Sequence, residues 1–293
     1  MDFIIATDSC CDLPLSFIQE NGIELFSLTV HLDDKEFPDD LGKSYDYHTF
    51  YESLRNGATP TTSQVNSYTF KEKFETWIKE GKTILYIGFS SAVSGTYSSS
   101  TAAKDELLEE YPDAKIITID TLCASGGQGL LVYYAAQMKK EGKSLEEIIS
   151  FIETTKNKIF HAFTVDDLNH LVRGGRLKAS SAFLGNLLQL KPVLYLSDAG
   201  TLVTHQKARG RKKALKALLE YYEAYHVSEN DIVCITHGDC SEEANYLASE
   251  LKETYNIQNI IVNPIGCVIG SHTGANVLAL FFLANTKTPK DSL

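Results

Sequence analysis

The chain has 293 residues, and its 43% hydrophobic and 22% charged residues are typical of a folded globular protein rather than a disordered or fibrous one. Its 38 acidic residues against 27 basic ones give a net charge of -11, which opposes broad contact with nucleic-acid phosphates. The six cysteines form neither a CxxC pair nor a zinc-like spacing with histidine, so we expect reduced thiols and no metal site.

The first half of the chain alternates short apolar runs with amphipathic segments. Strands are expected at 3–6, 24–30, 83–88 and 114–120, and helices at 14–21, 95–110, 125–140 and 144–156. Strands separated by helices predict βαβ units and a parallel, Rossmann-like sheet, whose site-bearing loops lie at the carboxyl ends of the strands. Because the first strand begins at residue 3, we expect no signal peptide and a cytoplasmic protein.

The pattern changes after residue 156. The segments 193–196 and 201–204 flank turn residues and predict a β-hairpin, and further strands are expected at 231–238 and 259–266. We therefore predict two α/β domains. An N-terminal parallel-sheet domain is expected at 1–158, and a C-terminal α/β domain with a mixed or antiparallel sheet at 159–293.

A serine-rich segment, GFSSAVSGTYSSS, follows the expected strand at 83–88. It matches a G-x-S-x-G nucleophile elbow only in part, because Ala92 stands where the second glycine is needed, and none of the eight histidines has a spacing that marks it as a catalytic base. Neither common phosphate-loop pattern occurs. Ser94 lies at an expected helix start, where a hydroxyl and free N–H groups can bind an anion, although on its own it is most simply a helix cap.

A second hydroxyl-rich segment, TTSQ at 61–64, precedes an amphipathic stretch, and we interpret it as another helix start. Two such helix starts in one parallel-sheet domain are expected to converge at the same edge of the sheet. Together they indicate an anion site.

Five segments together resemble the DegV family, and within it the fatty-acid-binding subunits of bacterial fatty acid kinase. They read TDSCCDLP (7–14), PTTSQ (60–64), SSAVSGTYSS (90–99), DDLNHLVRGGRL (166–177) and PIGCVIGSHTG (264–274). They are spread over the whole chain and keep the order of the family. The resemblance implies a two-domain protein that holds a lipid between its domains.

The resemblance also implies which residues hold the lipid. The carboxylate ligands would be Thr62, Ser94 and His272, with Ser63, Gly95 and Thr273 as near neighbours. The chain would then be a carrier without catalytic activity or a cofactor. It would bury a long-chain fatty acid and present the carboxylate to a separate kinase, which makes acyl phosphate for phospholipid synthesis.

Three further segments have a functional and a structural interpretation. Arg173 and Arg176 would lie near the headgroup entrance in the family, but they can also belong to a solvated surface. Lys207 and Arg209 belong to a dense basic run that suits either a solvated face or contact with the kinase or, transiently, an anionic membrane. The helical spacing of four apolar residues favours core packing or a movable lid over the acyl chain, and these residues are Phe183, Leu184, Leu187 and Leu188.

Two other functions stay open on the sequence. One is an acyl-ester hydrolase that uses a serine of the cluster at 90–94 as its nucleophile. The other keeps the same fold and carries a different amphiphilic lipid.

Overall fold

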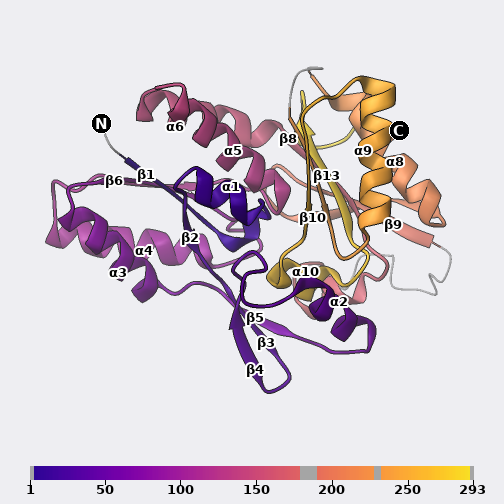
Figure 1. Cartoon of the computed structure of the whole chain (residues 1–293), viewed down its shortest axis with the longest axis horizontal. Coiled ribbons are helices and arrows are strands. Elements are labelled where there is room, and N and C mark those ends of the chain that lie inside the picture. Colours follow the sequence, from indigo (N-terminus) through magenta and orange to yellow (C-terminus); the bar gives the residue numbers. More distant parts are fainter. Residues whose placement is uncertain (1–2, 179–189, 228–231, 291–293) are drawn as a thin grey trace.

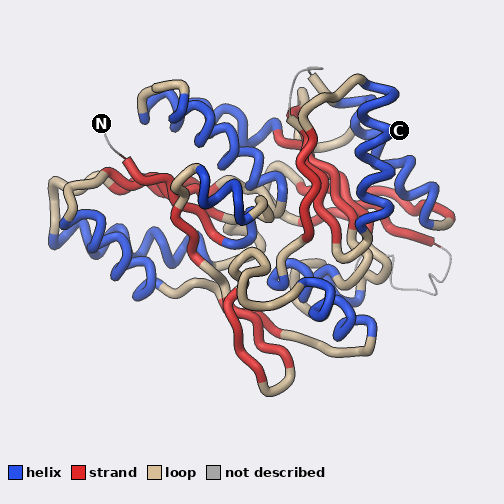
Figure 2. Tube along the Cα trace, viewed as in Figure 1, coloured by secondary structure: helices blue, strands red, loops and turns tan. Residues whose placement is uncertain are grey.

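The protein is described here from a computed structural model, which covers residues 3–178, 190–227 and 232–290. Figures 1 and 2 show two large β-sheets side by side, each flanked by helices, with a smaller sheet projecting below them, which has three strands. The lid residues expected at 183–188 lie outside the described residues.

The first sheet is four-stranded and parallel, in the order β2-β1-β6-β7. Its strands are β1 (Phe3–Asp8), β2 (Glu24–Phe26), β6 (Thr83–Gly88) and β7 (Ile116–Asp120). The chain runs from β1 outward to β2 on one side and from β6 to β7 on the other. The gap between β1 and β6 is therefore the switch point of the sheet, where ligand sites of open α/β folds form.

Helices pack on both faces of this sheet, as the βαβ pattern predicts. They are α1 (Leu15–Glu20), α3 (Ser67–Lys79), α4 (Thr96–Glu110), α5 (Gly126–Lys140) and α6 (Leu145–Thr155). α3 and α4 pack against each other, and α5 packs against α6. None of the described helices combines the length and the apolar character needed to cross a bilayer.

The second sheet has six strands in the order β10-β9-β8-β13-β11-β12. They are β8 (Ile159–Thr164), β9 (Leu190–Leu196), β10 (Leu202–Arg209), β11 (Val233–His237), β12 (Ile260–Pro264) and β13 (Leu278–Leu283). Only β11 and β12 pair in parallel; the other neighbours are antiparallel. The sheet is thus mixed, as predicted.

The side chains of β13 pack into two hydrophobic cores, one on each face of the second sheet. Leu280 and Phe282 belong to the core under α8 (Arg211–Tyr225) and α9 (Ser241–Tyr255), whereas Ala279 and Phe281 belong to the core that includes α5. Side chains on successive strand residues point to opposite faces, so a fully apolar strand can fill both cores. α5 contacts strands of both large sheets and therefore joins them.

A projecting unit, here called the arm, comprises residues 28–66. It contains β3 (Thr29–Leu32), β4 (Lys35–Pro38), α2 (Tyr47–Arg55) and β5 (Thr61–Ser63), with antiparallel strands in the order β4-β3-β5. The short helix α10 (Cys267–Thr273) contacts α2, β3 and β5, and also α7 (Asn169–Arg173). Two 3-10 turns, Ser9–Cys11 and Lys156–Lys158, complete the described elements.

Most of the expected elements are confirmed, including β6 with the bounds predicted and the hairpin of β9 and β10. Two predictions are wrong. The strand expected at 24–30 is broken into β2 and β3, which lie in different sheets, and the hydroxyls at 61–63 form a strand, while the helix behind them begins after its N-cap Asn66. The domain boundary near residue 158 stays a prediction; the strands of the parallel sheet all precede it and those of the mixed sheet all follow it.

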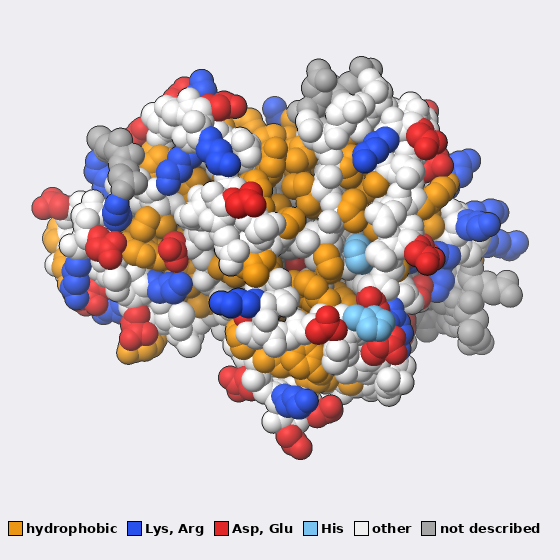
Figure 3. Space-filling view, viewed as in Figure 1, with side chains coloured by type: hydrophobic (Ala, Val, Ile, Leu, Met, Phe, Trp, Pro, Cys, Tyr) orange, Lys and Arg blue, Asp and Glu red, His pale blue; other side chains and the backbone are white. Residues whose placement is uncertain are grey.

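Charge is dispersed over the face in Figure 3, where acidic and basic side chains are interspersed and hydrophobic ones gather where the two large sheets meet. On this face the net negative charge is not concentrated in one patch.

Candidate functional site

One pocket lies where the carboxyl ends of β6 and β7 meet the α5 face of the mixed sheet, and α10 closes its side. Its atom-free space, which includes solvent at the open mouth, is about 960 Å³. Most of its wall is apolar, formed by Leu28, Phe89, Val93, Ala124, Phe163, Leu171, Leu196, Leu202, Ile265, Val268, Ile269, Val277, Ala279 and Phe281. Such a wall suits a hydrocarbon chain, because burial of apolar surface is favourable wherever it occurs.

The polar side chains of this wall include residues singled out from the sequence. Thr62, Ser94, His272 and Thr273 all line the pocket, although they come from the arm, the loop after β6 and α10. The fold brings these residues together, since 211 positions of the chain separate Thr62 from Thr273. That they hold a carboxylate stays a prediction.

His272 and Thr62 bond to each other across the pocket. The Nε2 atom of His272 lies 2.8 Å from the Thr62 hydroxyl, and either can donate, depending on the tautomer of the ring. The other ring nitrogen, Nδ1, lies against Gly174, where even a Cβ atom would collide with it. This glycine of the VRGGRL segment therefore allows the chain to approach the ring closely.

Burial, followed by the positive charges of Arg176 and Arg173, lowers the pKa of His272 from 6.5 to about 4. The ring is thus neutral near pH 7 in the free protein. A bound anion beside the ring would raise this pKa again, since it favours the charged form.

This lowered pKa predicts a specific pH dependence of stability. Between pH 6.5 and 4 the unfolded chain takes up a proton at His272 that the folded chain does not, so folding is progressively destabilised as the pH falls through this window. Replacing His272 by glutamine keeps a polar partner for Thr62 and removes the titration. In chemical denaturation at pH 7, 5.5 and 4.5, we expect the stability of the wild type relative to His272→Gln to fall at each step. A constant difference would contradict the lowered pKa.

Ser94 lies at the start of α4, as expected, but one position before the N-cap, which is Gly95. Its hydroxyl accepts a hydrogen bond from the Thr96 N–H at 3.2 Å and lies 3.0 Å from the Thr96 hydroxyl. A serine hydroxyl carries one proton and two acceptor lone pairs, so Ser94 can also donate one hydrogen bond into the pocket.

Gln64 is a pocket residue that the sequence analysis did not assign a role. Its amide donates to the Ser99 hydroxyl at 2.9 Å, and its Oε1 atom lies so close to Gly95 that a Cβ there would collide with it. Gly95 therefore does not line the pocket itself but makes room for Gln64. Its place at the end of the TTSQ segment was the available indication in the sequence that Gln64 lies at the pocket.

Arg176 also lines the pocket. Its Nε donates to the carbonyl of Val93 at 3.0 Å and its Nη1 to that of Gly174 at 2.6 Å, so the guanidinium is fixed by two backbone groups. Guanidinium carries five N–H donors, which leaves further donors beyond these two bonds.

The other predicted residues lie elsewhere. Ser63 points away from the pocket and shares a 2.7 Å hydrogen bond with His31, because neighbouring residues of a strand face opposite sides.

Arg173 is exposed and bonds His170 at 2.9 Å. Lys207 and Arg209 are exposed near the end of β10. The structure thus brings Arg176 to the pocket but not these three cationic residues.

The pocket wall also contains a polar pair of residues beside the mixed sheet, Ser125 and His161. Ser125 donates to Asp12 at 2.5 Å and lies 2.9 Å from the hydroxyl of Thr236. His161 accepts from the Ala124 N–H at 3.1 Å through Nε2 and reaches the Ile159 carbonyl at 3.0 Å through Nδ1. Because both side chains already have partners in the protein, they can border an apolar chain at low cost.

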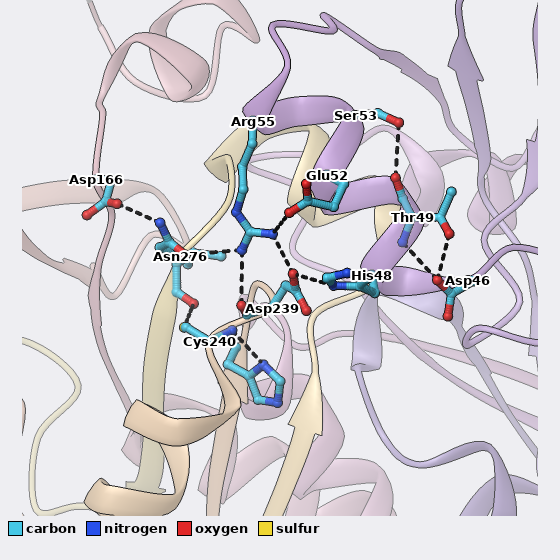
Figure 4. Close-up of polar contacts among 12 residues, drawn as sticks. Asp46, His48, Thr49, Glu52, Ser53, Arg55, Asp166, Asp239, Cys240 and Asn276 are labelled. Carbon is cyan, nitrogen blue, oxygen red and sulfur yellow. Dashed lines mark hydrogen bonds and ion pairs between the residues drawn. The ribbon is translucent and has the colours of Figure 1, made fainter.

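A second polar cluster joins the arm to the mixed-sheet half of the molecule (Figure 4). His48, Glu52 and Asp239 place ligand-type atoms within 4.8 Å of one another, a spacing that would suit a metal ion. However, Arg55 donates to Glu52 at 2.7 Å and to Asp239 at 2.5 Å, so its guanidinium already stands where a cation would. We interpret the cluster as an ion-pair link between α2 and the turn after β11.

Comparison with known proteins gives a consistent result over the whole chain. A family model described as "Uncharacterised protein, DegV family" matches residues 2–285. A DegV domain-containing protein of Clostridium perfringens is 51% identical over 288 residues, which cover 98% of this chain and 99% of that protein.

Solved structures of similar proteins carry ligand information in their descriptions. One from Thermus thermophilus, described as showing fatty acid binding of a DegV family protein, has a TM-score of 0.86 at 29% identity and covers 97% of this chain and all of that one. A protein from Eubacterium ventriosum, described as binding stearic acid, has a TM-score of 0.85 at 26% identity and covers 96% of this chain and 98% of its own.

Proposed function

The chain belongs to the DegV family, and on this premise we propose that it binds a long-chain fatty acid in the pocket between its two large sheets. The observation that carries this proposal is a pocket wall with an apolar majority and a smaller set of polar side chains, in which His272 and Thr62 meet at 2.8 Å. The solved relatives described as fatty-acid-binding proteins support it, because they share the fold over nearly the whole chain.

The energetics favour this ligand class. A carboxylate taken out of water needs several hydrogen-bond donors, and the bonded pair of Thr62 and His272, together with Ser94, supplies neutral ones while Arg176 adds a positive charge. Hydrogen bonds to a charged group contribute about 1.5 to 3 kcal/mol each. The acyl chain contributes about 0.8 kcal/mol for each buried methylene, so affinity would come from the chain and orientation from the headgroup.

We further propose that the chain is a non-catalytic carrier. A serine hydrolase needs a base within hydrogen-bond reach of its nucleophile and a third group that orients the base. Among the described residues, none of the serines at 90, 91 and 94 has a hydrogen bond to a histidine, and Ser90 donates instead to the Gly200 carbonyl at 3.0 Å. The lowered pKa of His272 also makes that ring a poor base near pH 7.

We propose that the bound fatty acid is passed to a separate kinase, which converts its carboxylate to acyl phosphate. Three exposed cationic residues could contact an acidic or phosphate-bearing surface of the kinase, and they are Arg173, Lys207 and Arg209. The same residues would allow a cytoplasmic protein to contact an anionic membrane surface transiently. If this is correct, acyl phosphate will form from ATP only when kinase, fatty acid and this protein are all present.

The binding proposal is tested by comparing palmitic acid with its methyl ester at neutral pH. The two have the same acyl chain, but the ester has no negative charge to accept hydrogen bonds from the polar group. We expect the acid to bind at least about tenfold more tightly, which corresponds to about 1.4 kcal/mol. Equal affinities measured by equilibrium dialysis would contradict the headgroup assignment, and failure of both to bind would contradict a lipid site.

A further inference from the structure

The position of α10 decides whether the polar group of the pocket is assembled. His272 and Thr273 lie at the carboxyl end of this helix, and His272 meets Thr62 of the arm at 2.8 Å. Helix α10 is only seven residues long, so its own hydrogen bonds cannot hold it in place. Its contacts at the other end therefore matter for the site.

That other end is anchored to the arm by Asp39. Asp39 is 2% exposed, and its Oδ2 accepts a hydrogen bond from the Val268 N–H at 3.0 Å, while the N–H of Cys267 also favours the charged carboxylate. The backbone passes so close that a Cβ atom on Gly266 would lie 2.7 Å from one carboxylate oxygen and 3.0 Å from the other. The Asp39 N–H donates to the Leu28 carbonyl at 2.8 Å, which fixes the residue within the arm.

The arm thus contacts both ends of α10, through Asp39 at the start of the helix and through Thr62 at its end. We propose that Asp39 is a positioning residue of the fatty-acid site, whose ionised carboxylate holds α10 against the arm so that His272 and Thr273 reach the ligand. This inference rests on the proposed function. It predicts that ligand affinity depends on the ionisation of a side chain that does not touch the ligand.

The groups around Asp39 explain why its ionisation is coupled to α10. The titratable groups that face it are Asp8, Asp12, Asp40, Cys10, Cys11, Cys267, Tyr47 and Tyr51. They include no cation, and the second oxygen of Asp39 is buried without a hydrogen-bond partner among the described residues. The two N–H groups of α10 are therefore the main stabilisation of the charge.

Burial raises the pKa of Asp39 to about 7, while the N–H groups of Val268 and Cys267 lower it. The ionised form is thus held by α10, and by linkage α10 is held by the ionised form. If only the ionised form is competent, about nine-tenths of the protein is competent at pH 8 and about one-eleventh at pH 6. Apparent affinity should fall about tenfold between these pH values through this group.

Asp12 is a second anchor at the start of α10. Its Oδ1 accepts from the Gly266 N–H at 2.8 Å, and burial raises the pKa of this carboxyl well above its ordinary value. Asp12 is present in the wild type and in the variants compared below, so its own titration enters all of their affinities alike.

The test compares the wild type with Asp39→Asn in competition binding of palmitate at pH 8 and pH 6. The fatty acid and His272 titrate in both proteins, so their effects cancel in the ratio of affinities. We expect the ratio of wild-type to variant affinity to be about tenfold larger at pH 8 than at pH 6. Asp40→Asn is the matched control, because it removes the neighbouring, less buried charge, which bonds Ser44 rather than α10. Asp39 keeps its carboxylate and its contact with α10 in this variant and loses only one repelling neighbour, so the ratio should change much less with pH than it does for Asp39→Asn.

Thermal unfolding separates positioning from plain structural damage. Because the fold disfavours the charge of Asp39, the neutral variant should be no less stable than the wild type at pH 8. Weaker binding with unchanged stability supports the proposal, whereas a ratio that is the same at both pH values overturns it. If neither protein binds palmitate at any pH, the proposed function itself has failed.

A measurement on the wild type covers the case in which Asp39→Asn does not fold. With ¹³C-labelled aspartate carboxyls, the signal that titrates near pH 7 should move to lower pH on addition of palmitate, since ligand and ionisation favour the same position of α10. An unchanged midpoint in a protein that binds palmitate would overturn the proposal.

Discussion

Replacing Ala279 by phenylalanine is expected to lower the affinity for a long-chain fatty acid at least about a hundredfold. Ala279 is 4% exposed and belongs to the apolar part of the pocket wall that β13 provides. A phenyl ring there would take the space of roughly four methylenes, and at about 0.8 kcal/mol each this removes about 3 kcal/mol of binding free energy. Affinity can be measured by displacement of a fluorescent fatty acid.

Leu280→Phe is the matched control for this experiment. Residue 280 follows on the same strand but faces α8 and α9 instead of the pocket, and it is equally buried. Both substitutions overpack a core and are expected to cost about 1 to 3 kcal/mol of folding stability. Only the pocket variant should lose binding, and a folded Ala279→Phe protein that binds palmitate normally would show that the chain lies elsewhere.

The second large effect is expected for His272→Ala, which should weaken fatty-acid binding by about tenfold to a hundredfold. The variant removes one donor to a buried carboxylate, worth about 1.5 to 3 kcal/mol. It should leave the affinity for the methyl ester nearly unchanged, because the ester makes little use of this donor. Equal losses for acid and ester would indicate that the histidine supports the pocket wall instead.

Thr62→Val completes a double-mutant cycle with His272→Ala. The two side chains bond each other at 2.8 Å, so each single variant also disturbs the partner of the other. We therefore expect the double variant to lose less affinity than the sum of the two single losses. Strict additivity would indicate that the two residues act on the ligand independently.

The elements predicted correctly are those whose signal is local. β6 is a continuous apolar run bounded by turn residues, and α5 begins after Ser125 and ends in Lys139 and Lys140. Each is specified by its own residues and needs no distant partner to be recognised.

The arm was missed because its strands are only three or four residues long and pair with each other rather than with the large sheets. The alternation of Val30, Leu32 and Phe37 with polar residues around a turn at Asp33 was the available signal. β13 was overlooked for a different reason. Its short apolar run does not alternate, and such a run does not distinguish a strand buried on both faces from a buried helix.

The residues of the site also differ in whether a local sequence pattern points to them. The motif residues Thr62, Ser94 and His272 were named through resemblance to a family, and the fold brings all three to one pocket. Asp39 was not foreseen, because it lies in an acidic stretch that reads as a solvated loop. Its burial depends on N–H groups 228 and 229 positions further along the chain, which no local pattern reveals.

Native mass spectrometry of the purified protein, followed by extraction with organic solvent, tests the central claim most directly. The carrier account predicts a one-to-one, non-covalent adduct whose mass is that of a long-chain fatty acid, released intact by the solvent and diminished in Ala279→Phe. A protein without any acyl adduct that also fails to take up added palmitate would contradict it. So would an acyl group that remains covalently attached to a serine after extraction.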